Sequence, residues 1–73
     1  MVEKMRDFLN SEKVYVRVGL EGENDPVRRR EICWNARQRA LGAVTFALRC
    51  GLDVGEAEAM FDQFCDWLKE VKK

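Results

Sequence analysis

Arginine is the residue type in this 73-residue chain that is best suited to hold a ligand. Its guanidinium group presents a planar fork of N–H donors that matches phosphate and carboxylate oxygens. Trp34 lies among five arginines and offers a ring on which an unpaired base can stack. The candidate residues for binding nucleic acid, with single strands favoured, or another partner are Arg28, Arg29, Arg30, Trp34, Arg37 and Arg39. In the alternative interpretation, these arginines form salt bridges with acidic side chains and Trp34 belongs to the core.

The residue content gives little support to catalysis. The chain has no histidine, so the usual general base near neutral pH is missing. The segment Gly19-Leu20-Glu21-Gly22 lacks both the spacing and the Lys-Ser/Thr pair of a phosphate-binding loop. We expect no catalytic residue, no cofactor and no enzymatic activity.

The three cysteines, Cys33, Cys50 and Cys65, indicate neither a metal site nor a disulfide framework. Their number is odd, and no two of them form a Cys-x-x-Cys pair. Each falls on the apolar face of an expected helix. We therefore expect buried, reduced thiols and no bound metal.

Charge is balanced overall but unevenly distributed along the chain. Residues 1–25 carry four Lys/Arg against six Asp/Glu, residues 26–52 six against one, and residues 53–73 three against six. The middle third is therefore strongly basic, and both flanking segments are acidic. Such asymmetry indicates charged partner surfaces even though the net charge is zero.

A long helix is predicted over residues 25–50. Asp25 is a good N-cap, Pro26 suits the first helical position, and Gly51 suits the left-handed position after the last turn. The inner seam of this helix is rich in alanine, which allows a neighbouring helix to approach closely. The seam consists of Ala36, Ala40, Ala43 and Ala47.

A second amphipathic helix is predicted over residues 53–72, because apolar side chains recur at i, i+3, i+4 and i+7 from Val54 to Val71. Its acidic residues line the opposite face. The short link after Cys50 makes the two helices antiparallel neighbours. That arrangement brings Lys69, Lys72 and Lys73 to the arginine-rich end of the hairpin.

The N-terminal unit, residues 1–22, is predicted to contain a short helix over residues 2–9 and then a strand. The strand prediction follows from the alternation of apolar residues in Val14, Val16, Val18 and Leu20. A lone strand must pair with something. The simplest pairing is with the same strand of a second copy, and a weak hairpin with residues 2–6 or a foreign strand are alternatives.

The long helix has more apolar surface than one neighbouring helix can cover. Trp34, Leu41 and Leu48 lie along one edge of that surface. We expect them to meet the strand, the N-terminal helix or a second subunit.

Together these patterns predict a single domain over residues 1–73. Its fold class is mainly α with a small β element, with an antiparallel two-helix hairpin after a helix/strand unit, assembled as a homodimer. No apolar run approaches the roughly 20 residues of a membrane span, and no signal peptide is evident. We expect a cytoplasmic protein, located in the host cell cytoplasm if it is encoded by a phage.

The last 40 or so residues resemble a helical-hairpin module of small phage and prophage proteins, which also follows phage recombination and single-strand-annealing domains. The matching segments are Arg30-Glu31-Ile32-Cys33-Trp34-Asn35-Ala36-Arg37-Gln38-Arg39-Ala40-Leu41 and Ala57-Glu58-Ala59-Met60-Phe61-Asp62-Gln63-Phe64-Cys65-Asp66-Trp67-Leu68. The resemblance implies a mobile-element origin and a DNA-related or anti-defence setting. It assigns no site.

Three functional hypotheses follow. The first is a non-catalytic phage accessory protein that binds nucleic acid, or a nucleic-acid–protein complex, through the arginine-rich helix end. The second is an inhibitor of a host defence nuclease, such as an anti-CRISPR protein, acting through the acidic face of the second helix or the open strand edge. The third is a structural oligomerisation module.

Overall fold

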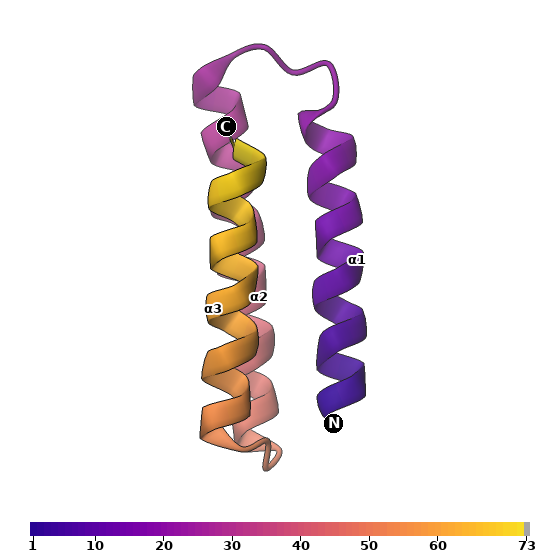
Figure 1. The fold of residues 1–73 in the computed structure, drawn as a ribbon, viewed down its shortest axis with the longest axis vertical. Helices are drawn as coiled ribbons and strands as arrows, with labels where there is room; N and C mark the ends of the chain where they lie inside the picture. Colours follow the sequence, from indigo (N-terminus) through magenta and orange to yellow (C-terminus); the bar gives the residue numbers. More distant parts are fainter. Residues whose placement is uncertain (73) are drawn as a thin grey trace.

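The computed structural model describes residues 1–72, which form three α-helices joined by two short connections (Figure 1). The helices are α1 (Val2–Leu20), α2 (Pro26–Arg49) and α3 (Val54–Lys72). The chain runs up α1, down α2 and up α3, so α2 is antiparallel to both of its neighbours (Figure 1). Helix α2 packs along both other helices, whereas α1 and α3 contact each other much less. The resulting bundle measures 40 by 16 by 15 Å.

The prediction for the N-terminal unit was wrong. Residues 2–20 form one continuous helix, and no strand occurs within residues 1–72. The structure therefore contradicts three predictions: the small β element, the strand pairing across a homodimer and the open strand edge. A helix satisfies its own backbone groups, so nothing in this segment requires a pairing strand.

The buried positions of α1 explain the error. They are Met5, Leu9, Glu12, Val16 and Leu20, and their spacings of three and four residues follow the helical period. The fully buried Val16 contrasts with Val18, which is 65% exposed. Glu12 occupies a core position, and an acidic residue there interrupts the apolar helical pattern in the sequence. The alternating valines then imitate a strand.

Both ends of α2 follow the predicted local signals, and a similar cap begins α3. The Asp25 side chain accepts a hydrogen bond from the backbone N–H of Val27 at 3.0 Å, and Pro26 begins α2. Gly51 has a φ of 102° in the turn after α2, a conformation that glycine adopts without steric cost. The Asp53 carboxylate accepts a hydrogen bond from the backbone N–H of Glu56 at 3.1 Å in the first turn of α3.

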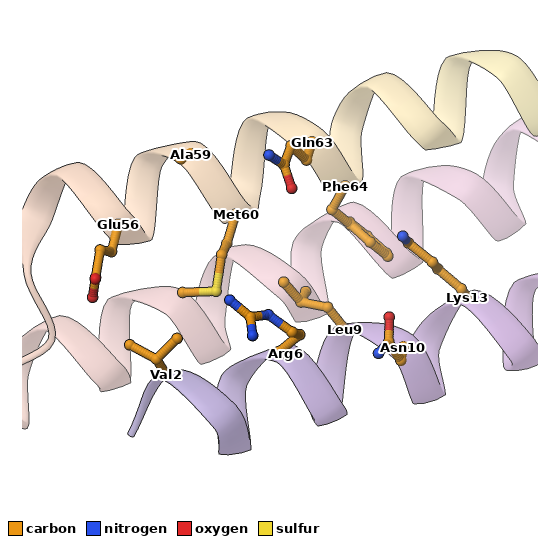
Figure 2. Close-up of a pocket in the computed structure, with 10 residues that line it drawn as sticks. All are labelled: Val2, Arg6, Leu9, Asn10, Lys13, Glu56, Ala59, Met60, Gln63 and Phe64. Atoms are coloured by element: carbon orange, nitrogen blue, oxygen red, sulfur yellow. The ribbon is translucent and has the colours of Figure 1, made fainter.

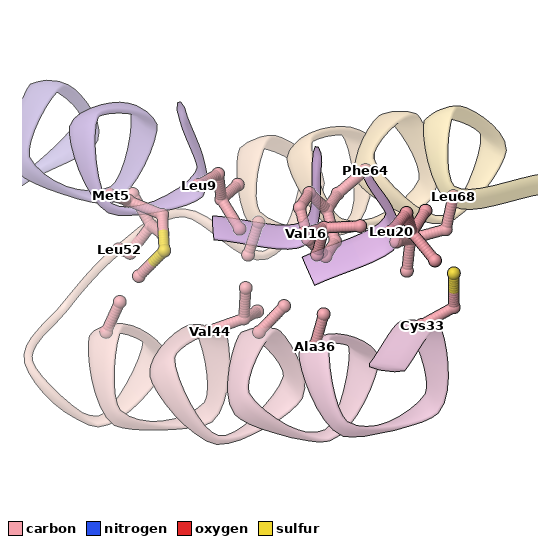
Figure 3. Close-up of a cluster of buried hydrophobic side chains, with 13 residues drawn as sticks. Met5, Leu9, Val16, Leu20, Cys33, Ala36, Val44, Leu52, Phe64 and Leu68 are labelled. Atoms are coloured by element: carbon pink, nitrogen blue, oxygen red, sulfur yellow. The ribbon is translucent and has the colours of Figure 1, made fainter. Parts of the chain in front are cut away.

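One apolar core lies between the three helices (Figure 3). The predicted alanine seam of α2 is present there, with Ala36, Ala40 and Ala47 buried and Ala43 partly buried. The small seam leaves room for Val16 and Phe64, the largest side chains that are fully buried. Burying a side chain as large as Phe64 stabilises the fold by about 1.5–3 kcal/mol.

The helices are too polar to cross a lipid bilayer. None of them, within residues 1–72, combines the length and the apolar composition of a membrane-spanning segment.

Candidate functional site

The arginines of α2 point in different directions, because successive residues of a helix are rotated by about 100°. Arg29 faces the end of α1. Its Nη1 donates hydrogen bonds to the backbone oxygens of Leu20, at 3.0 Å, and Glu23, at 2.8 Å. These bonds satisfy carbonyl groups at the end of α1 and in the following loop. Arg29 therefore fastens the first connection to α2.

Arg39 also faces α1, where it forms a two-pronged salt bridge with Glu12. Arg39 Nε donates to one carboxylate oxygen at 2.8 Å, and Nη2 donates to the other at 3.0 Å. The guanidinium group also lies 5.2 Å from the ring centre of Tyr15. The hydrogen bond to Glu12 is the main cause that raises the pKa of Arg39. For this residue, the salt-bridge interpretation of the sequence was correct.

The other candidate arginines, Arg28, Arg30 and Arg37, form no ion pair with any residue from 1 to 72. Arg28 is exposed near the start of α2. Arg30 and Arg37 instead lie on the side of α2 that faces α3, two helical turns apart. These two residues are the arginines that a ligand between the helices can reach.

A groove of about 320 Å³ opens between α2 and α3 at this end of the bundle. Its lining combines four cationic side chains with apolar ones and includes no Asp or Glu. The lining residues are Arg30, Cys33, Trp34, Arg37, Cys65, Leu68, Lys69 and Lys72. We call this the cationic groove. Lys69 and Lys72 lie here beside the arginine-rich end of α2, as expected. Lys73 lies outside the described residues.

Trp34 lies beside the groove and is 59% exposed, so the alternative prediction of a core tryptophan was wrong. The Arg37 guanidinium lies 5.6 Å from the Trp34 ring centre and 5.5 Å from that of Phe61. These two aromatic rings hold the arginine through cation–π contacts without neutralising its charge. The arrangement keeps a cation and an open aromatic surface side by side.

The two lysines on the α3 side remain available to an anion. Lys69 approaches Asp66 only at 4.0 Å, and both side chains are exposed. Such a surface pair contributes little. Within the described residues, Lys72 forms no ion pair. The groove is thus positive on both of its sides.

The sequence gives no sign that Cys33, Cys65 and Leu68 belong to the site. They form the apolar part of the groove, although the amphipathic pattern marked them only as core positions. Burial raises the pKa of the Cys33 thiol, and the nearby charges of Lys72 and Arg29 oppose that effect. A thiol held in its neutral form is a poor nucleophile. Cys50 is exposed and Cys65 is half-buried, so the expectation that all three thiols are buried holds only for Cys33.

No metal centre is apparent in the part of the chain that the structure covers. Among residues 1–72, no three His, Cys, Asp or Glu side chains are grouped as metal ligands would be. The acidic residues of α3 instead spread over its outer surface.

A second cavity of about 360 Å³ separates the N-terminal halves of α1 and α3 (Figure 2). Leu9, Met60 and Phe64 form its apolar floor, and its rim carries charges of both signs, with Arg6 on α1 and Glu56 on α3. Mixed charges make this cavity a poorer site for a polyanion than the cationic groove.

Farther along, α1 and α3 come together at Trp67. Lys13 and Arg17 of α1 lie 5.7 and 5.6 Å from its ring centre. These two cations of α1 are therefore engaged in cation–π contacts. The second tryptophan lies within the bundle, where it is half-buried.

No family model, curated protein or solved structure matches this chain. The resemblance of the last 40 or so residues to a phage helical hairpin therefore stays a prediction.

Proposed function

We propose that this protein is a non-catalytic nucleic-acid-binding protein that holds a single strand in the cationic groove. The observation that carries the proposal is the convergence of Arg30, Arg37, Lys69 and Lys72, from two helices, around the exposed ring of Trp34. Phosphates supply most of the affinity of nucleic-acid complexes, and cationic side chains supply their counter-charge. The groove offers that charge together with a stacking surface.

A single strand suits this groove better than a duplex. Stacking on Trp34 requires a base whose face is free, and the bases of a duplex already stack on one another. An exposed aromatic ring beside accessible cations is the combination that proteins use to bind single strands with little sequence preference. The groove is small, with a volume of about 320 Å³, so we expect it to contact only a short segment of a longer strand.

The setting that we propose is that of an accessory protein of a phage or prophage, acting in the host cell cytoplasm. The support for it is the hairpin resemblance of α2 and α3. The inhibitor hypothesis keeps one observation in its favour, because Glu58, Asp62 and Asp66 are exposed along α3. A row of acids can dock on the basic surface of a nuclease. The open strand edge no longer supports that hypothesis.

Salt-dependent binding of a labelled oligonucleotide tests the proposal directly. Fluorescence anisotropy with a single strand of about 10 nucleotides should show saturable binding at low salt. Two to four phosphate contacts predict a log–log salt slope of about −1.4 to −2.8. A duplex of the same sequence should bind more weakly. An absence of binding at low salt would refute the proposed function.

Matched variants identify the surface that is responsible. Arg30→Ala combined with Arg37→Ala should reduce affinity at least about tenfold and lower the salt slope by roughly 1.4, because two contacts are lost. Arg49→Ala is the control, since Arg49 is exposed at the other end of α2. Equal losses in the control, or wild-type affinity in the double variant, would exclude the groove.

Tryptophan fluorescence tests the stacking step. In a Trp67→Phe background, Trp34 is the only tryptophan, so any quenching by an oligonucleotide reports on that ring. We expect strong quenching by a single strand and little by inorganic polyphosphate, which has no base. Quenching of equal size by both ligands would show that Trp34 senses charge and does not stack.

A further inference from the structure

The surface formed by α2 and α3 continues beyond the cationic groove toward the turn that joins the two helices. Residues seven positions apart lie on nearly the same side of a helix. Leu41 and Leu48 therefore continue the stripe that begins at Trp34, and they are 40% and 37% exposed. On α3, Glu58 and Asp62 lie seven residues before the groove residues Cys65 and Lys69. Both acids are exposed.

The two ends of this helix pair have opposite charge. The groove end, residues 26–39 and 64–72, carries seven Lys/Arg and three Asp/Glu, a net charge of +4. The turn end, residues 40–63, carries one Arg and four Asp/Glu, a net charge of −3. The turn end has no lysine, and its single arginine is Arg49. The α2–α3 surface is thus positive and aromatic at one end and acidic and leucine-bearing at the other.

We propose that a second copy of this chain packs antiparallel on the α2–α3 surface, and that it competes with nucleic acid for the cationic groove. A two-fold axis across the helices places the positive end of each copy on the acidic end of the other. Trp34 of each copy then meets Leu41 and Leu48 of its partner copy. The competition rests on the proposed function, whereas the dimer itself does not.

Charge complementarity selects a second copy as the occupant. Each chain carries both the positive and the acidic half of the interface, so two identical chains satisfy both contacts at once. In a parallel arrangement, the two groove ends, each with a net charge of +4, would face and repel each other. The exposed apolar side chains account for the attraction that remains when salt screens the charges.

The size of the surface indicates a weak, reversible dimer. The molecule is 40 Å long and 16 Å wide, so an end-to-end overlap reaches only the small end of specific interfaces, roughly 1,200 Å² in total. Weak association is what competition with a ligand requires, because a ligand must supply the free energy that separates the copies.

Sedimentation of the full chain over a range of concentrations tests the dimer. The wild-type protein should pass from monomer to dimer as concentration rises at low salt, and added salt should shift it back toward monomer. Glu58→Lys with Asp62→Lys should weaken dimerisation at least about tenfold. A protein that remains monomeric at all concentrations at low salt would overturn the inference and leave the proposed nucleic-acid binding untouched.

A charge-swapped pair gives the sharpest result. The Glu58→Lys/Asp62→Lys variant and an Arg30→Glu/Arg37→Glu variant should each remain monomeric, because in each the charge opposition between the two ends is largely removed. Mixed together, they should associate, since the introduced glutamates then face the introduced lysines and the two unchanged ends again join cations to acids. All four positions are exposed or half-buried, and circular dichroism verifies folding. Two folded variants that do not associate when mixed would contradict the antiparallel arrangement.

The competition is tested with neutral variants, which add no positive charge. In the wild-type protein, saturating single-stranded oligonucleotide should convert dimer to monomeric complex. A Glu58→Gln/Asp62→Asn variant should dimerise less and show an affinity that no longer depends on protein concentration. A dimer that stays intact with an oligonucleotide bound at the groove would refute competition. Absence of oligonucleotide binding in the Glu58→Gln/Asp62→Asn variant, whose groove is then free of a second copy, would instead refute the proposed function.

Discussion

The two sides of α2 use the same residue type for different purposes. On the α1 side, Arg29 donates to the carbonyls of Leu20 and Glu23, and Arg39 is bound by both oxygens of Glu12. On the α3 side, Arg30 and Arg37 line an open groove with no carboxylate in its lining. The difference teaches that an arginine cluster in sequence is not a cluster in space. Because successive residues are rotated around the helix, some of these arginines stabilise the fold and others remain available to a ligand.

The neighbouring helices account for the difference. Helix α1 directs Glu12 inward, and that side chain is almost completely buried. Helix α3 directs Cys65, Lys69 and Lys72 toward the groove and keeps its acids on the outside. An almost buried carboxylate needs a cation to offset its desolvation. An exposed cation needs no such partner, so it remains available to a ligand.

The largest expected effect distinguishes the buried from the exposed side of α1. Val16→Asp places an unpaired charge at a position with 0% exposure and should cost more than about 4 kcal/mol. Val18→Asp lies on the solvent side and should cost about 0.5 kcal/mol. Urea unfolding monitored by circular dichroism measures both. Similar costs at the two positions would fit the alternation of a strand and contradict the helix.

A smaller effect should separate the two sides of α2. Arg39→Ala leaves Glu12 without its partner in an almost buried position. Because the Arg39 side chain is itself 42% exposed, the cost should be about 1–2 kcal/mol, below that of a fully buried pair. Arg30→Ala should change stability by less than about 0.5 kcal/mol. Chemical denaturation of both variants measures the loss of unfolding free energy. Equal losses would contradict the proposal that Arg39 stabilises the fold and Arg30 does not.

The smallest expected effect concerns pH and the thiol beneath the groove. Burial raises the pKa of Cys33 in the folded state. Above the ordinary thiol pKa, the unfolded chain loses this proton while the folded chain keeps it, so the free energy of unfolding falls as pH rises. Below that pKa the contribution is fully present.

Unfolding experiments at neutral and alkaline pH measure this effect. The loss of stability should be smaller in Cys33→Ala than in the wild-type protein, because only the thiol at position 33 differs between the two. Identical pH profiles would show that Cys33 ionises as easily in the fold as in the unfolded chain.

Short-range signals in the sequence predicted α2 and α3 well. Asp25, Pro26 and Gly51 act through the backbone of their immediate neighbours, so their effect does not depend on distant residues. The same holds for the apolar stripe of α3, which repeats without interruption. The antiparallel hairpin follows from its short connection, and it brings Lys69 and Lys72 to the arginine end.

The N-terminal unit could not be predicted in this way. Glu12 reads as a surface residue until Arg39, 27 positions later, supplies its partner across the α1–α2 contact. Once Glu12 is accepted as a core position, Met5, Leu9, Val16 and Leu20 form one helical stripe. Propensity alone favoured a strand for the valines, and tertiary packing overrode it.

The sequence by itself determined the positions of α2 and α3, their caps and the uneven distribution of charge, because these depend on neighbouring residues or on composition. Only the tertiary structure decided that residues 2–20 form a helix. It also decided that Arg29 and Arg39 serve the fold while Arg30 and Arg37 remain open to a ligand. The physical reason is that burial and charge pairing are properties of contacts between distant segments, and the sequence does not specify which segments meet.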